Sequence, residues 1–170
     1  MFKFVGAAFV IAAGWLAGSL LERNVTERIG ALSSIIPALS ILKAEIENLM
    51  TPIPEAFEAL SDSASYPASG IFSGTCALMN DGESFADAFS EIIRDNSQRY
   101  GLFDEDAAVL TELAPVLGRY SAAEQAARLS QAVYRLQEQL NKAYAEHKKN
   151  GKLYKTMGLM LGFLLVIVTL

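Results

Sequence analysis

Residues 121–149 read SAAEQAARLSQAVYRLQEQLNKAYAEHKK, and this stretch decides the fold class. Its seam positions recur at alternating intervals of four and three residues: Ala122, Ala126, Leu129, Val133, Leu136, Leu140, Ala143 and His147. Ser121 and Glu124 form the S-x-x-E pattern of a capping box, which marks a helix start. A seam of this kind packs lengthwise against a second helix. That partner is either the first long helix of the same domain or a neighbouring subunit, and short connections favour the former.

The residues before position 51 predict a first long helix with helical spacing of its apolar side chains: Val25, Ile29, Leu32, Ile36, Leu39 and Ile46. Pro37 lies inside this pattern, so we expect a kink or a break there, at a cost of about 3 kcal/mol. Thr51 and Pro52 then predict a new helix, with Thr51 as its N-cap and Pro52 at its first position.

Three further short helices are predicted over residues 71–79, from Ser84 onward, and from Asp104 up to Gly118. No alternating strand pattern stands out along the chain. The sequence therefore predicts an all-α protein, an antiparallel helical bundle flanked by membrane helices at both ends. The expected boundaries are an N-terminal transmembrane helix over residues 1–21, a helical domain over 22–152 and a C-terminal transmembrane helix over 153–170.

The membrane assignment rests on two apolar terminal runs. Residues 4–21 contain no charge and would span roughly 27 Å as a helix, close to the bilayer core. An uncleaved anchor is favoured over a cleavable signal ending near Ala17-Gly18-Ser19, because the run is longer than a signal's apolar region. Residues 157–170 form a shorter apolar run. The run can be extended back to residue 153 if the side chain of Lys155 reaches the lipid headgroups. The alternative to a transmembrane helix is a buried core helix or a helix that lies in the plane of the membrane surface.

Each run carries G-x-x-x-G, at Gly14 and Gly18 and at Gly158 and Gly162, so close packing of membrane helices is possible. Four lysines, Lys148, Lys149, Lys152 and Lys155, precede the last run. By the positive-inside rule they place the central domain in the cytoplasm.

Charge is segregated along the chain. Residues 44–112 carry 14 acids and two arginines, whereas residues 113–156 carry eight bases and three acids. The two regions either neutralise each other within the domain or leave an acidic face for a basic partner protein. In the second case, Glu58, Asp87 and Glu91 are the candidate docking residues.

Residues with catalytic chemistry are scarce. The chain has one cysteine, Cys76, and one histidine, His147, and it contains no phosphate-binding loop, dinucleotide fingerprint, nucleophile elbow or zinc-protease motif. Acids outnumber bases 19 to 14, which argues against nucleic-acid binding. We therefore expect no enzyme activity, no catalytic residue, no cofactor, no metal site and no small-molecule substrate. Asp104, Glu105 and Asp106 are interpreted as capping residues of a helix.

Several local patterns, in this order and spacing, carry a resemblance to a known family. They are Trp15 with Gly18, Thr26-Glu27-Arg28, Ala44-Glu45-Ile46, Thr51-Pro52-Ile53 with Glu55-Ala56, Leu117-Gly118 with Gln125, and Lys152, Lys155, Gly158 and Gly162. The sequence resembles the stage III sporulation protein AB family over nearly its whole length. Pro37, and Ser121 in place of the usual aspartate, depart from the family pattern.

The resemblance implies a secretion F-like cytoplasmic domain, similar to the inner-membrane platform protein of type II secretion systems. It implies a structural component of the channel complex between mother cell and forespore, in the mother-cell membrane around the forespore. The partners that the resemblance implies are a secretion-type ATPase and ring-forming membrane proteins. The two apolar runs add membrane lipid as an expected partner. A membrane-anchored regulatory or ligand-binding protein, or a secreted helical protein with a cleaved signal, are the alternative functions.

Overall fold

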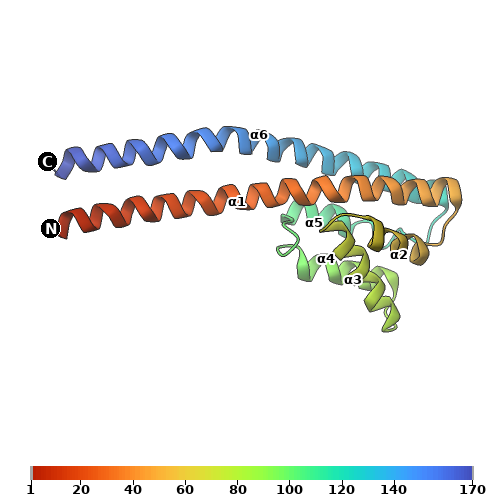
Figure 1. Cartoon of the computed structure of the whole chain (residues 1–170). Coiled ribbons are helices and arrows are strands. Elements are labelled where there is room, and N and C mark those ends of the chain that lie inside the picture. Colours follow the sequence, from red (N-terminus) through yellow and green to blue (C-terminus); the bar gives the residue numbers. More distant parts are fainter. Residues whose placement is uncertain (1, 170) are drawn as a thin grey trace. The chain divides into compact units, whose positions relative to one another are not determined.

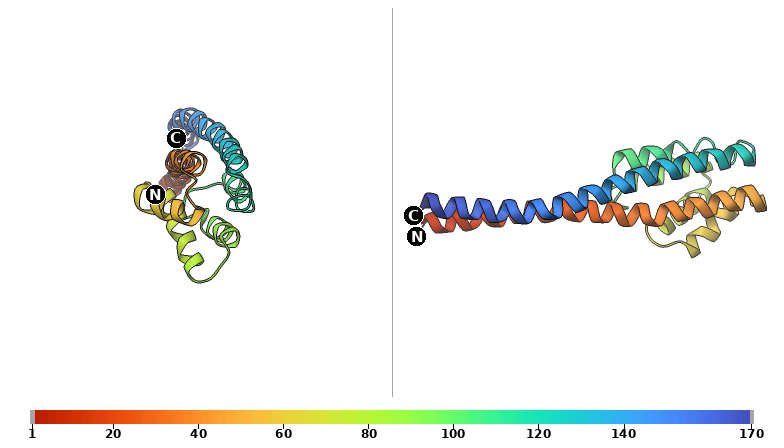
Figure 2. Two further views of the ribbon diagram at one scale, coloured as in Figure 1. Left: turned by 90° about the vertical axis from the view of Figure 1, so that its right-hand side faces the viewer. Right: turned by 90° about the horizontal axis from the view of Figure 1, so that it is seen from above.

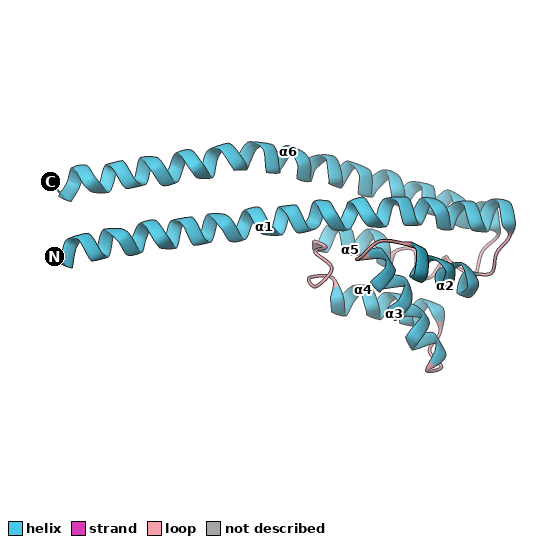
Figure 3. Cartoon of the chain, viewed as in Figure 1, coloured by secondary structure: helices cyan, strands magenta, loops and turns pink. Residues whose placement is uncertain are grey.

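The backbone is helical, and residues 2–169 contain no strand (Figure 3). The computed structural model describes the backbone of residues 2–169 and the side chains of residues 23–149. In chain order the elements are α1 (Phe2–Ala44), the π-helical turn η1 (Glu45–Leu49), α2 (Ile53–Ser63), α3 (Ala68–Asn80), α4 (Phe85–Asn96), α5 (Asp104–Thr111) and α6 (Ala122–Thr169) (Figure 1). The predicted all-α fold class is confirmed.

The chain divides into two units. One comprises residues 27–141, and the other comprises the terminal segments 1–26 and 142–170. The predicted membrane spans, 1–21 and 153–170, belong to the terminal unit, and their side chains lie outside the described residues. The same holds for Gly14, Gly18, Gly158 and Gly162, so their predicted packing role stays a prediction.

Among the described side chains, the segment Arg23–Leu49 is long and apolar enough to cross a membrane, with a mean hydropathy of 1.5. Half of the most apolar 18-residue stretch of this segment is buried inside the protein. A core helix meets the same criteria of length and composition, and the burial of α1 in the 27–141 unit accounts for the apolar character of this segment.

The 27–141 unit is built on an antiparallel pair formed by the second half of α1 and the first half of α6 (Figure 2). Leu32 and Leu39 of α1 share one apolar core with Leu129 and Leu136 of α6, and all four side chains are almost completely buried. The short helices α2–α5 pack against one side of this pair (Figures 1 and 2). The predicted seam of α6 is therefore confirmed, and within this unit its partner is the first long helix of the same chain.

Pro37 does not break α1, which continues through it to Ala44. The side chain of Pro37 is exposed, and so is Ser33 one turn earlier. Because proline has no N–H, the backbone carbonyl of Ser33 receives no helical hydrogen bond from residue 37. Water can satisfy that carbonyl on the exposed face. On the opposite face, burial of Ile36, Ala38 and Leu39 offsets the cost of the missing bond.

The predicted cap at Thr51 is wrong by one residue. The N-cap of α2 is Pro52, and the helix begins at Ile53. Thr51 instead continues the turn that follows η1: its backbone N–H donates to the Glu45 carbonyl at 3.2 Å, and its Oγ1 donates to Glu45 Oε2 at 2.8 Å. Two hydrogen bonds to Glu45 thus hold Thr51 outside α2.

The starts of α4 and α5 follow the sequence prediction, whereas α3 (Ala68–Asn80) begins three residues before the predicted start at residue 71. Ser84 Oγ accepts the Asp87 N–H at 3.3 Å and caps α4, and α5 begins at Asp104. The helix predicted up to Gly118 is shorter, because α5 ends at Thr111 and turns occupy most of the stretch to Gly118. Gly118 has a φ of +79°, which favours glycine and ends these turns.

Candidate functional site

The helices that carry the predicted docking acids are held together by phenylalanine rings. Phe57 of α2 is completely buried, and its ring meets Phe72 of α3 edge-on with the centroids 4.8 Å apart. Phe85 and Phe89 of α4 lie 4.9 and 5.7 Å from the same ring. Edge-to-face pairs contribute about 0.5–1.5 kcal/mol each beyond their burial. The rings therefore fix α2 and α4 as neighbours.

Two of the three predicted docking acids are exposed on these neighbouring helices. Glu58 follows Phe57 on α2, and Asp87 lies in the first turn of α4, where it accepts a hydrogen bond of 2.6 Å from Ser84 Oγ. Glu91, one turn further along α4, is partly buried. Within the described residues, none of the three forms an ion pair, so their negative charges are uncompensated by a basic side chain.

Glu58 also lies close enough to α3 to act on Cys76. This cysteine is a free thiol that packs, partly buried, against the core, as its small apolar character predicts. Burial raises the pKa of the Cys76 thiol, and the negative charge of Glu58 raises that pKa further. The thiol is therefore kept in its protonated, weakly nucleophilic form at neutral pH.

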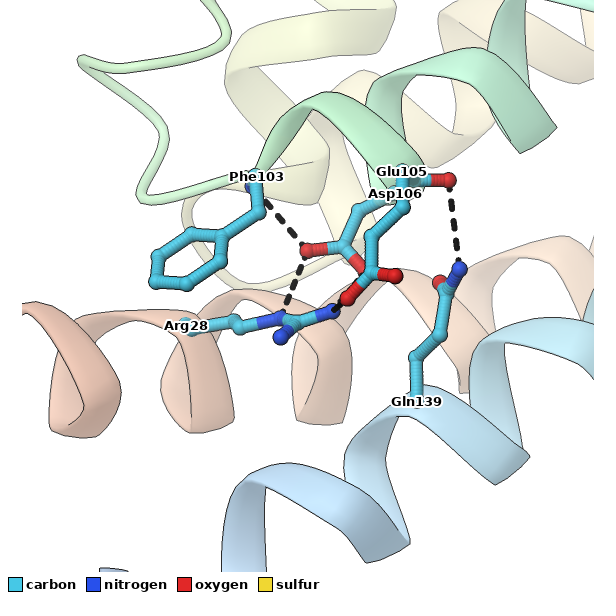
Figure 4. A network of polar contacts seen from close by, with 5 residues as sticks. All are labelled: Arg28, Phe103, Glu105, Asp106 and Gln139. Atoms are coloured by element: carbon cyan, nitrogen blue, oxygen red, sulfur yellow. Dashed lines mark hydrogen bonds and ion pairs between the residues drawn. The ribbon is translucent and has the colours of Figure 1, made fainter. Parts of the chain in front are cut away.

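A buried polar network joins α1, α5 and α6 (Figure 4). Arg28 of α1 forms a two-pronged ion pair with Asp106 of α5: its Nε lies 2.8 Å from Oδ2 and its Nη2 lies 2.7 Å from Oδ1. The side chain of Arg28 is 4 % exposed and that of Asp106 is 0 % exposed. Glu105 Oε1 accepts from the same Nη2 at 2.5 Å, and Gln139 of α6 donates from Nε2 to the Glu105 carbonyl at 3.2 Å.

The surroundings of this network compensate the buried charge. The N–H of Phe103 donates to Asp106 Oδ2 at 3.0 Å, and the Phe103 ring lies 4.4 Å from Arg28 Cζ in a cation–π contact. Burial alone lowers the pKa of Arg28, but the hydrogen bonds to Asp106 and Glu105 outweigh burial, so that the pKa of Arg28 is raised. Arg28 and Asp106 therefore form a buried ion pair that holds α5 against α1.

Gly101 allows the loop before α5 to reach α1. Its φ is +72°, a left-handed conformation that suits glycine. A Cβ at this position would lie 3.1 Å from the carbonyl oxygen of Glu27, so a larger residue would push the loop away from α1. The glycine thus brings Phe103 and Asp106 within reach of Arg28.

The sequence prediction of Asp106 as a capping residue is confirmed, but its partner Arg28 was missed. A signal for Arg28 is present in the sequence: it lies four residues before Leu32 and seven before Ile35, in line with the buried face of α1. A charged residue in an apolar stripe indicates a buried partner.

A hollow of about 60 Å³ lies between α6 and the turns after α5. Its lining includes Val109, Leu113, Arg128 and Arg135, and Arg135 forms an ion pair with Glu112. The hydrogen bond from Arg135 lowers the pKa of Glu112. Small-molecule sites are commonly 300–1,000 Å³, so this hollow has room for one side chain of a partner and not for a substrate.

Comparison with known families decides the affiliation of the chain. The family model of stage III sporulation protein AB matches residues 3–170. The chain belongs to this family.

A curated member of the stage III sporulation protein AB family is similar along its whole length. Stage III sporulation protein AB of Bacillus subtilis (strain 168) is 25 % identical over 169 residues, which cover 99 % of each chain. A solved structure of a stage III sporulation protein AB superposes with a TM-score of 0.64 at 22 % identity, covering 71 % of this chain and 96 % of the other. The family resemblance drawn from local patterns is thus confirmed, and the all-helical fold agrees with that of a solved family member.

Family membership makes this chain a sporulation protein. Arg28 is the last residue of one of the local patterns that carried the resemblance, and the structure gives it the central place in the buried network. Gln125, from another of these patterns, connects α6 to the preceding turn. It accepts the Gly118 N–H at 3.0 Å and donates to the Tyr120 carbonyl at 2.7 Å.

Proposed function

We propose that this chain is a non-enzymatic platform and assembly component of the sporulation channel complex between mother cell and forespore. One observation carries the proposal: the two helices that build the core of the 27–141 unit, α1 and α6, also contain residues 4–21 and 157–169 of the two apolar runs. A domain whose central pair continues into two apolar segments is suited to being held at a membrane from both ends.

The location proposed is the mother-cell membrane around the forespore, with the central domain in the cytoplasm. The four lysines before the last apolar run support this orientation. Two flanking transmembrane helices, over residues 1–21 and 153–170, complete the proposed topology.

Docking is proposed to take place on the exposed surface of the helical domain. The uncompensated charges of Glu58, Asp87 and Glu91 would attract a basic surface of a secretion-type ATPase or a ring-forming membrane protein. The Arg28 network supports a structural role, because its charged groups are engaged with each other and join three helices.

The docking proposal is tested by reversing the three charges together, as Glu58→Lys, Asp87→Lys and Glu91→Lys, in the full chain. Capture of the purified ATPase and ring proteins should fall at least tenfold at low salt, with helicity and membrane insertion retained. The matched control reverses three exposed acids of α6, Glu124, Glu138 and Glu146, which changes the net charge equally. Equal capture by both variants would remove the acidic face from the mechanism.

The topology is tested with a reporter inserted between α2 and α3, in residues 64–67, and by the intact mass of the mature protein. We expect activity of a cytoplasmic reporter, retention in the membrane after carbonate extraction, and an uncleaved N-terminus. A shortened N-terminus with a soluble product would instead support the secreted alternative.

A further inference from the structure

Exposed aliphatic side chains gather at one end of the 27–141 unit. Among the described residues, the large aliphatic side chains that are exposed are Ile41 (51 %), Leu49 (69 %) and Met50 (79 %); the other large exposed hydrophobic residues are aromatic. All three lie at the C-terminal end of α1, in η1 or at the residue that follows η1. We call Ile41, Leu49 and Met50 the apolar tip.

The π-helical turn brings two of these side chains to one face. Eight residues of regular α-helix would place Leu49 about 80° around the axis from Ile41. The turn Glu45–Leu49 is wider than an α-turn and rotates the chain less per residue, which moves Leu49 back toward the face of Ile41. The π-turn therefore brings Leu49 nearer to the face of Ile41, with the partly buried Glu45 between them in the sequence.

The backbone at Met50 also favours exposure of the tip. Met50 has a φ of 54°, in the left-handed region that glycine usually occupies at a helix end. A methionine there is strained and adds an apolar side chain in water, and neither property improves the stability of the isolated chain. Strained backbone positions cluster at binding sites, where a partner compensates the cost.

The charges around the tip indicate the chemistry of that partner. Residues 41–58 contain four glutamates and one lysine, Lys43, which pairs with Glu47 at 3.6 Å. Glu55, in the first turn of α2, is exposed and forms no ion pair within the described residues. Exposed aliphatic side chains close to an excess of negative charge complement a helix that carries aliphatic residues on one face and lysine or arginine beside them.

We propose that the apolar tip is a docking site for a basic amphipathic helix of a protein partner. The aliphatic face of that helix packs on Ile41, Leu49 and Met50, and its basic residues lie toward Glu47 and Glu55. This site goes beyond the acidic face of α2 and α4, because burial of apolar area and not charge alone holds the partner.

The experiment uses the full chain in nanodiscs of zwitterionic lipid and a fluorescent 18-residue helical peptide of leucine and lysine. A second peptide keeps the leucines and replaces every lysine by glutamate. The test variant combines Leu49→Ser with Met50→Gly, and the control variant is Tyr134→Ser, which removes a side chain that is 66 % exposed on α6. Empty nanodiscs give the binding to lipid alone.

We expect the leucine–lysine peptide to bind the wild-type chain at least tenfold more tightly than the leucine–glutamate peptide. The double variant should weaken this binding at least tenfold, and Tyr134→Ser should leave it unchanged. The thermal unfolding of the double variant should not shift to lower temperature, because both side chains are exposed and glycine accommodates the φ of residue 50.

Equal binding of both peptides, or unchanged binding by a folded double variant, would overturn the proposal. Binding equal to that of empty nanodiscs would assign the peptide to lipid. Self-association of the wild-type chain that the double variant abolishes, without peptide binding, would assign the tip to a second copy. The variants used here leave Glu58, Asp87 and Glu91 unchanged. A negative result for the apolar tip can therefore be distinguished from a negative result for docking on the acidic face.

Discussion

Asp106 has two roles in a single carboxylate. It accepts the Phe103 N–H at the start of α5 and it neutralises Arg28 of α1. Removing one member of a buried ion pair leaves an uncompensated charge, which costs more than the pair contributes. Because both roles depend on the same two oxygens, substitutions at this residue affect the start of α5 and its attachment to α1 together.

Asp106→Asn is therefore expected to lower the free energy of unfolding by about 3–5 kcal/mol. The double substitution Arg28→Met with Asp106→Leu should recover most of this loss, apart from about 1 kcal/mol for the lost cap. Urea denaturation of the full chain measures both. Glu105→Gln serves as the control, because the Glu105 side chain is 55 % exposed and the change should cost less than about 1 kcal/mol. A double variant as unstable as the single one would show that the pair itself stabilises the fold.

The proximity of Glu58 to Cys76 leads to a chemical prediction. Glu58→Gln removes a negative charge that raises the pKa of the thiol, so this pKa should fall and the thiolate fraction at pH 8 should increase. We expect alkylation of Cys76 by iodoacetamide to accelerate, by no more than about threefold because solvent and salt screen the charge. Glu55→Gln, on the same helix, should leave the rate unchanged. A slower reaction of the Glu58 variant would contradict this placement.

At the scale of the helices, the seam of α6 is the element on which the core depends. Leu136 is completely buried, whereas Tyr134, two residues earlier, is 66 % exposed. Leu136→Ala should lower the free energy of unfolding by about 2–5 kcal/mol, as expected for a buried leucine. Tyr134→Ala should change it by less than about 0.5 kcal/mol. A comparable loss in the two variants would mean that the exposed face of α6 is packed in solution.

Because Pro37 is exposed, replacing it should make the protein more stable. Pro37→Ala supplies the N–H that the Ser33 carbonyl lacks and has no buried contact to lose. We expect the free energy of unfolding to rise by about 1–3 kcal/mol. Ser33→Ala, one turn earlier on the same face, should stay within about 0.5 kcal/mol of wild type. Destabilisation by Pro37→Ala would show that the fold requires the proline.

The order of the helices could be predicted from sequence because helix starts depend on neighbouring residues, as at Ser84 and Asp104. The α6 seam could also be predicted, because the alternating spacing of its apolar residues is visible in the sequence. No local signal in the sequence indicates the π-turn or the left-handed backbone of Met50. The start of α2 lies one residue later than predicted, because hydrogen bonds to Glu45 hold Thr51 outside the helix. The Arg28–Asp106 pair joins residues 78 positions apart, so only the folded chain specifies it. The three acids that we predict to take part in docking were chosen by counting charges along the sequence, which gives their number but not their surroundings.

At the scale of the whole molecule, the apolar core extends from Ala31 to Leu140 and lies inside the 27–141 unit. A fragment of residues 23–149 should therefore remain helical and unfold cooperatively without either terminal run. Calorimetry and circular dichroism check this. Addition of Leu136→Ala to the fragment should lower its unfolding temperature. A fragment that melts gradually would show that the terminal segments are required for the fold.

The pairing of Leu32 and Leu136 in one core also governs the order of events during synthesis. A ribosome adding about 5–20 residues per second needs roughly 5–20 s to pass from one leucine to the other. Throughout that interval the apolar face of α1 has no α6 to cover it, and α2–α5 are synthesised within it. The nascent chain therefore presents a leucine-rich helix surface to chaperones. Folding of this protein is completed only when the last helix arrives.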